Sequence, residues 1–334
     1  MKKKTALIVS TSILGLIIFI LVLNFMDFKI LFDNFKEFSI FPFLAYLLVS
    51  ILMMITGVYR WKVILKAHGF RIRFWRLFSY KIAGFSLCYI TPGALVGGEA
   101  LRAYLLKRND VKFTEGISSV IIDKFFDLSI AALLTSVGII IAISFFNISS
   151  YYKAVILLVT VAWVVMLSFF LYGSLTKKGF FRHIFRFLHI YRIKSLGKLE
   201  EKVEETEKHI SHFFRRHKRA FRRCVVISLI LWLLMFVEYK IATAVFGYNA
   251  SLVAVFLIIC MVGFSYTFPV PGALGVLEAT QASIHSLVGL KAAQGFLLSL
   301  LVRARDIFWT ILGIIFIYYH GISLAKQLSG NEKK

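Results

Sequence analysis

Acidic residues and cysteines are scarce in this chain. The first shortage makes the chain strongly basic, and the second argues against disulfides and cysteine-ligated metal sites. Seventeen Asp and Glu stand against forty Lys and Arg, which gives a formal net charge of +23. The three cysteines, Cys88, Cys224 and Cys260, show no CxxC spacing, so neither a disulfide framework nor a cysteine-ligated metal site is indicated. No Walker A, GxSxG or HExxH signature occurs, so nothing indicates nucleotide hydrolysis or nucleophilic catalysis. We expect neither a cofactor nor a metal.

Long apolar runs take up most of the 334 residues. Apolar residues make up 59% of the chain and the mean hydropathy is +0.80, which is too apolar for a soluble domain. A run of about 20 apolar residues crosses a bilayer core, so the sequence predicts an all-α, polytopic transmembrane bundle. The first run is longer than a signal-peptide core and lacks an A-x-A-like cleavage site, which favours a retained span. Full spans are predicted near 5–23, 42–59, 116–145, 153–174, 224–246 and 295–319.

One membrane-embedded motif occurs twice. Residues 84–100 read GFSLCYITPGALVGGEA and residues 263–279 read GFSYTFPVPGALGVLEA, with nine of seventeen positions identical in a gap-free alignment. Hydrophobic segments that are duplicated and broken by Pro-Gly point to the binding site of a transporter. The same register aligns Lys124 with Arg303 and Asp127 with Asp306. The identical pairs are Gly84/Gly263, Phe85/Phe264, Ser86/Ser265, Pro92/Pro271, Gly93/Gly272, Ala94/Ala273, Leu95/Leu274, Glu99/Glu278 and Ala100/Ala279.

The Pro-Gly breaks predict two re-entrant hairpins, at 79–96 and 259–290. Proline removes a backbone donor, and irregular backbone survives inside a membrane only where protein or a water-filled cavity surrounds it. The alternative is that 251–268 and 273–290 each cross fully, which would leave the match to the first copy without structural meaning. The hairpins are the favoured interpretation.

Charge placement sets the topology. Segment 60–112, Arg60 included, carries eleven Lys and Arg against two acidic residues, and 176–223 carries fifteen against five. The positive-inside rule places both segments and both termini in the cytoplasm. Six spans and two hairpins, one entering from each side, then form an inverted repeat. The basic charge is explained by anionic lipid headgroups, so nucleic acid is not an expected partner.

The chain therefore divides into two repeats inside a single transmembrane domain, 1–334. Repeat 1 covers about 42–175 and repeat 2 about 224–320, with a cytoplasmic loop, 176–223, between them. The middle of that loop has an apolar helical face opposite its glutamates, which predicts an amphipathic helix that lies on the bilayer or packs on another helix. His209 and His212 in this helix are better explained as solvated residues than as metal ligands.

Charges within apolar sequence are costly and are functional candidates by default. One interpretation is structural, in which Glu99 pairs with Lys124 or Arg102, Glu278 pairs with Arg303, and Asp127 and Asp306 cap a helix or pair nearby. The other is transport, in which half-helix N-termini and basic residues bind a phosphate while the carboxylates orient those basic residues or carry a proton. The candidate residues are Pro92, Gly93, Glu99, Arg102, Asp123, Lys124, Asp127, Pro271, Gly272, Glu278, Arg303, Arg305 and Asp306.

Four motifs follow one another along the chain: GEALRAYLL after the first Pro-Gly, DKFFDL at 123–128, PGALGVLEA at 271–279 and the last span with Arg303. In this order they resemble the flippase-like family named after the transmembrane region of lysylphosphatidylglycerol synthase. The resemblance implies a polytopic membrane protein linked to translocation of modified phospholipids or lipid-linked glycans. It carries functional roles over to Glu99, Arg102, Asp127, Glu278 and Arg303. This chain departs from the family pattern at Asp123-Lys124, Leu277 and Asp306.

Three functions follow as hypotheses. The first is a flippase-like transporter for an anionic or modified phospholipid, or a polyprenyl-phosphate lipid, in the cytoplasmic membrane. The second, suggested by the family name, is transfer of lysine to phosphatidylglycerol, against which the short tail after the last span offers no soluble catalytic domain. The third is a scaffold that holds a lipid- or glycan-modifying enzyme through 176–223. The sequence fixes neither the lipid, the direction, the energy source nor the oligomeric state.

Overall fold

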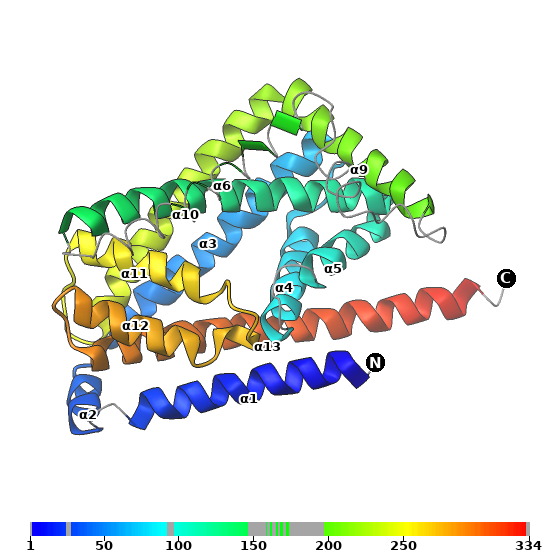
Figure 1. Ribbon diagram of the computed structural model, residues 1–334. Coiled ribbons are helices and arrows are strands. Elements are labelled where there is room, and N and C mark those ends of the chain that lie inside the picture. The colour runs from blue at the N-terminus through cyan, green and yellow to red at the C-terminus, as the bar shows by residue number, and fades with distance from the viewer. Residues whose placement is uncertain are drawn as a thin grey trace. The chain divides into compact units, whose positions relative to one another are not determined.

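The computed structural model describes residues 2–24, 28–91, 97–145 and 197–331, with a few single residues between 158 and 173. Within these ranges the chain is helical and contains no strand (Figure 1). The all-α prediction is therefore confirmed for the described part. The elements are α1 (Lys2–Asn24), α2 (Phe28–Lys36), α3 (Ile40–Ala67), α4 (Phe74–Ile90), α5 (Gly97–Leu106), the 3-10 turn η1 (Lys107–Asn109), α6 (Phe113–Phe145), α9 (Gly197–Arg216), α10 (Lys218–Val245), α11 (Leu252–Ser265), the 3-10 turn η4 (Pro271–Ala273), α12 (Val276–Leu287) and α13 (Ala292–Asn331).

Five of the six predicted spans coincide with helices, namely α1, α3, α6, α10 and α13. The sixth, 153–174, lies outside the continuously described residues. By length and composition, α3 and α10 are long and apolar enough to cross a membrane. The C-terminal helix α13 is 40 residues long and carries an exposed apolar stripe in which Phe308, Ile311, Ile315 and Tyr319 follow helical spacing. A stripe of this size on the outside is typical of a surface that meets lipid or another protein.

The chain forms two compact units, each built from segments that are distant in sequence. Unit 1 contains 1–52, 75–102 and 235–334, and unit 2 contains 53–74 and 103–234. In unit 1, α12 packs against α1, α11 and α13, and α2 packs against α13.

The helices of the two sequence repeats begin at matching places. A 179-residue shift carries Gly97, the start of α5, onto the start of α12, and carries Phe113, the start of α6, onto the start of α13. A 178-residue shift carries α3 onto α10, and both are 28 residues long. Glu99 and Glu278 are thus each the third residue of the helix that follows a break. The duplication seen in the sequence motif is therefore also present in the positions at which the helices begin.

The second break is built on left-handed backbone. Gly272 has φ 55°, Ala273 has φ 52° and Gly275 has φ 75°, a region that residues with a Cβ occupy only at a cost. Gly275 also approaches α1 so closely that a Cβ would meet the side chain of Ile18 at 2.7 Å. Glycine is required there both for the turn and for the contact with α1. The first break, with Pro92 and Gly93, lies outside the described residues.

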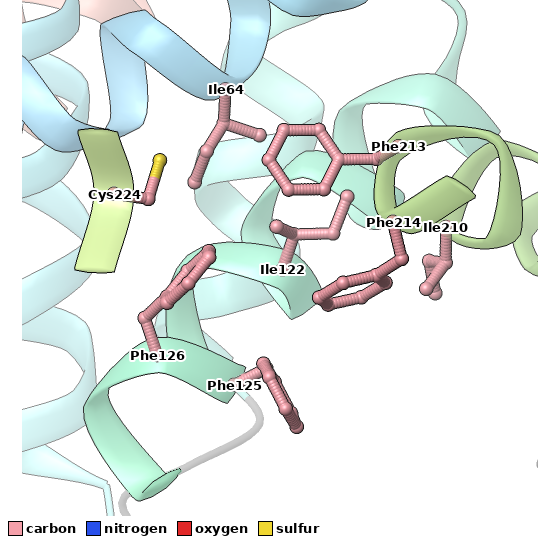
Figure 2. Close-up of a cluster of buried hydrophobic side chains, with 8 residues drawn as sticks. All are labelled: Ile64, Ile122, Phe125, Phe126, Ile210, Phe213, Phe214 and Cys224. Atoms are coloured by element: carbon pink, nitrogen blue, oxygen red, sulfur yellow. The ribbon is translucent and has the colours of Figure 1, made fainter. Parts of the chain in front are cut away.

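Unit 2 has its core where α9 packs on α6. Figure 2 shows Phe213 and Phe214 of α9 facing Ile122, Phe125 and Phe126 of α6, with all five buried. The amphipathic helix predicted within 176–223 exists, and its apolar face packs on another helix, which was one of the two alternatives. Residues 176–196 of that loop lie outside the described residues.

Candidate functional site: buried ion pairs around two helix breaks

Arg303 of α13 binds the second break directly. Its guanidinium donates from Nη1 to the carbonyl oxygen of Gly272 (3.0 Å), from Nη2 to the carbonyl oxygen of Ala273 (3.1 Å), and from Nη2 to Oε2 of Glu278 (2.8 Å). Nε donates to the other oxygen of Glu278. The ion pair between Glu278 and Arg303, expected under the structural interpretation, is confirmed. Arg303 closes the loop between η4 and the first turn of α12.

Arg305, two residues further along α13, binds two carboxylates. Its Nη1 donates to Oε2 of Glu238 at 2.8 Å, and its Nε and Nη2 both lie near Oδ1 of Asp306, at 3.0 and 2.9 Å. The Tyr266 hydroxyl, just after α11, donates to Oδ2 of Asp306. Glu238 comes from α10, so this cluster joins three helices of unit 1.

Tyrosines complete the surroundings of these ion pairs. Tyr46 of α3 and Tyr239 of α10 are both fully buried and interact electrostatically with Arg305 and Glu238. The ring of Tyr89 lies against Gly272, beside Arg303. Hydroxyl groups carry no charge at neutral pH, so the electrostatics of the cluster are set by its two arginines and three carboxylates.

The cations are the more accessible members of the cluster. The side chains of Arg303 and Arg305 are 11% and 15% exposed, whereas those of Glu278, Glu238 and Asp306 are 0%, 1% and 5% exposed. The small exposed area of these ion pairs therefore belongs mainly to the arginine side chains, and the carboxylates are buried. The two arginines differ in what holds them: Arg303 is bonded partly to backbone carbonyls, whereas Arg305 is bonded to side chains.

The first repeat places its charges differently. Glu99, half-buried in α5, accepts a hydrogen bond from the Cys88 thiol of α4 at 3.2 Å. Arg102 is buried, and its stem fits against Gly84, where a Cβ would come within 2.6 Å of Cγ. Gly98 approaches the same turn of α4. The two glycines therefore allow α4 and α5 to lie close together at the break.

Unit 2 contains a second buried ion-pair cluster, centred on Arg60. This side chain is 1% exposed and bonds Oδ1 of Asp123 (2.8 Å), Oδ1 of Asp127 (2.6 Å) and the Ser228 hydroxyl (2.9 Å). Asp127 itself is half-exposed at 49%. Lys124 lies between the two aspartates and is partly buried. Asp127 is thus paired nearby, as the structural interpretation expected, but its partner Arg60, which also binds Asp123, was not named from the sequence.

Sequence reasoning missed Arg60 and Glu238. Arg60 was counted with the cytoplasmic charges and was not named as a site candidate, whereas its guanidinium is buried and paired with carboxylates. Glu238 lies inside the predicted span 224–246, so the cost of an acidic residue in an apolar run was a signal that could have identified it. Arg60 is harder to find, since it directly follows a predicted span.

Comparison with known proteins agrees with this helical, apolar architecture. Residues 7–313 match the family described as the lysylphosphatidylglycerol synthase TM region. A UPF0104 membrane protein of Methanothermobacter thermautotrophicus is 23% identical over 98% of this chain and 99% of its own length. A UPF0104 membrane protein of Pyrococcus horikoshii is 24% identical over 83% of this chain and 86% of its own length.

A shorter match reaches higher identity. A UPF0104 membrane protein of Methanocaldococcus jannaschii is 30% identical over 38% of this chain and 39% of its own length. The family match covers nearly the whole chain, as the resemblance of the four motifs implied. This chain is a membrane-located protein that belongs to the lysylphosphatidylglycerol synthase TM region family of integral membrane proteins.

Proposed function

We propose that this protein moves a lipid with an anionic headgroup across the cell membrane, and that Arg305 is the main contact of the headgroup. The observation that carries the proposal is the arrangement of the unit 1 cluster: the arginine side chains keep a small exposed area, 11% for Arg303 and 15% for Arg305, whereas their carboxylate partners are at most 5% exposed. A cation of this kind within an apolar sequence fits a phosphate headgroup better than a sugar or a metal ion.

Arg305 suits this role better than Arg303 does. Displacing Arg303 would release two backbone carbonyls of the break and would leave Glu278 buried without a partner. Displacing Arg305 breaks no hydrogen bond to the backbone of the break, because the bonds of its guanidinium go to the side chains of Glu238 and Asp306. We therefore assign Arg303 to holding the break and Arg305 to the headgroup.

The proposed topology follows the charge distribution. Six spans and two re-entrant hairpins, with both termini in the cytoplasm, would give the two repeats opposite orientations. The helix starts that match at shifts of 178 and 179 residues support a structural repeat. In an inverted repeat, one copy rocking against the other would expose the site alternately to each side.

The scaffold hypothesis is less well supported. Its docking surface was the amphipathic helix in 176–223, but α9 uses Ile210, Phe213 and Phe214 inside unit 2. The face of α9 that remains for a partner protein therefore consists mainly of charged side chains. The lysyltransferase hypothesis ranks below transport, because no specific observation in α10–α13 favours acyl transfer over headgroup binding within the described residues.

Translocation of fluorescent lipids in proteoliposomes tests the proposal. Arg305→Gln is expected to reduce the movement of anionic lipid at least tenfold, Arg305→Lys to retain part of it, and the exposed Arg71→Gln to leave it unchanged. Because Arg305→Gln leaves two buried carboxylates, Arg305→Gln/Glu238→Gln serves as a second variant whose folding is checked by size-exclusion chromatography. Wild-type rates in folded Arg305 variants would refute the assignment.

A further inference from the structure

Glu238 is a buried carboxyl group with one oxygen that no partner satisfies. Its side chain is 1% exposed, Oε2 accepts from Arg305, and Oε1 has no hydrogen-bond partner within the described residues. An acceptor buried in this way costs free energy unless a proton or a donor reaches it. The position lies within the apolar run of α10, where water is a poor substitute for a partner.

The charges around Glu238 do not balance. The groups that face it are Arg305 and Asp306 from α13, Tyr46 from α3, and its neighbour Tyr239. Among the residues that the structure describes, Arg305 is the single cation that pairs with the two carboxylates Glu238 and Asp306. The nearby pair Glu278–Arg303 is neutral by itself, and the tyrosines are uncharged. One negative charge in this buried cluster is therefore left without compensation.

Hydrogen bonding decides which carboxyl group takes up a proton. Asp306 accepts from Nε and Nη2 of Arg305 and from the Tyr266 hydroxyl, and each of these bonds favours its ionised form. Glu238 accepts from Arg305 alone. An isolated carboxylate in an apolar interior is neutralised by protonation rather than left charged. We propose that Glu238 is a proton-binding site of this protein, in which the proton occupies Oε1.

This site couples to lipid movement, a step that rests on the proposed function. An anionic headgroup and an ionised Glu238 compete for Arg305, so the headgroup binds best when Glu238 carries its proton. By reciprocity, the bound headgroup favours protonation by the same factor. An O–H bond forms at Oε1 of Glu238 when a proton and the headgroup enter from one side of the membrane. It breaks when the proton returns to water on the opposite side. Proton and anionic headgroup then travel together.

Infrared titration of the purified protein tests the proton site without any lipid transport. A protonated carboxyl band is expected at pH 7 in wild type and in the surface variant Glu201→Gln, and its intensity is expected to fall in Glu238→Gln. Gln matches a protonated Glu in shape, so folding should be retained, and Glu238→Asp, which keeps a titratable group, provides a second comparison. An unchanged carboxyl band in folded Glu238→Gln would overturn the proposal.

Transport under a pH gradient tests the coupling separately. One pH unit across the proteoliposome membrane should change the transmembrane ratio of anionic lipid by about tenfold in wild type, for one proton per headgroup. Glu238→Gln should remove this response. A wild type that moves anionic lipid with no response to the gradient would overturn the coupling. If wild type moves no lipid at all, the proposed function fails, while the infrared result still decides the proton site.

Discussion

At the scale of single residues, Arg60 and Glu238 occupy equivalent places with opposite charge. Each is the twenty-first residue of its 28-residue helix, α3 or α10. Each pairs with the fourth helix of its own repeat, Arg60 with Asp123 and Asp127, and Glu238 with Arg305. In both repeats an ion pair joins the first helix to the fourth. In the first repeat the arginine lies on the first helix and the aspartates on the fourth, whereas in the second repeat the glutamate lies on the first helix and the arginine on the fourth.

The Arg60–Asp123 pair should be strongly coupled. Because both side chains are 1% exposed, Arg60→Met leaves the buried Asp123 without its cation and should lower the free energy of unfolding by about 3–5 kcal/mol. Asp123→Leu should cost less, because Arg60 keeps its ion pair with Asp127. The double variant should recover most of that loss. The measurement is denaturation in mixed micelles, with Arg71→Met as an exposed control. Additive losses in the double variant would contradict the pairing.

Some contacts of single residues could be predicted from the sequence, and others could not. It predicted the pair Glu278–Arg303, since a charge after a break and a charge in the next span need each other. It did not predict that Arg303 also binds the break's carbonyl oxygens, because backbone contacts between distant segments leave no pattern in side-chain types. Arg60 was missed because a basic residue at a span end satisfies the positive-inside rule equally well.

At the scale of elements, the break before α12 determines where α1 packs. Gly275 combines positive φ with a close approach to Ile18. Gly275→Ala should therefore destabilise the protein by more than about 1 kcal/mol and should loosen α1. Gly263→Ala in α11 is the matched control, since a Cβ there meets nothing within 4 Å. Thermal denaturation and amide hydrogen exchange of α1 measure both effects; equal stability of the two variants would contradict this packing.

The contact of α9 with the end of α3 should weaken in acid. His68 stacks on Phe213, and burial lowers the pKa of His68 below its usual value. When α9 is undocked, His68 binds a proton at its ordinary pKa of about 6.5. Lowering the pH from 7.5 through that value therefore favours the undocked form.

Hydrogen exchange in α9 at pH 7.5 and 5.5, corrected for the intrinsic exchange rates, measures this loss of protection. His68→Gln removes the titrating group, so its protection should depend less on pH than that of wild type. Equal pH dependence in wild type and His68→Gln would assign the effect to another group.

Element boundaries were the most predictable part of the molecule. Apolar runs gave α1, α3, α6, α10 and α13 to within a few residues at most ends, because length and hydropathy define such helices. The exceptions, the far ends of α3 and α13 and the start of α10, extend beyond the apolar run, because a helix can continue into water once it has been nucleated. The choice between bilayer and protein for the apolar face of α9 required the structure, since both bury the same side chains.

At the scale of the whole molecule, the proposed inverted repeat, with one hairpin entering from each side, predicts which loops face which side of the membrane. In a variant without Cys88, Cys224 and Cys260, Asn249→Cys should react with a membrane-impermeant maleimide in intact cells. Lys112→Cys should react only after permeabilisation. Thr267→Cys, near the tip of the second hairpin, should not be reached from the cytoplasm. Labelling of Thr267→Cys from the cytoplasmic side would instead favour two full crossings.

The most direct test of the account is whether the purified wild-type protein moves lipids according to headgroup charge. Fluorescent phosphatidylglycerol and phosphatidylcholine are compared in proteoliposomes by bleaching the outer leaflet, with empty liposomes as the reference. If the protein moves anionic lipids, phosphatidylglycerol should reach the bleaching reagent at a rate well above that in empty liposomes. The rate for phosphatidylcholine should rise far less. Equal rates for the two lipids, or no movement of either above the reference, would contradict the account.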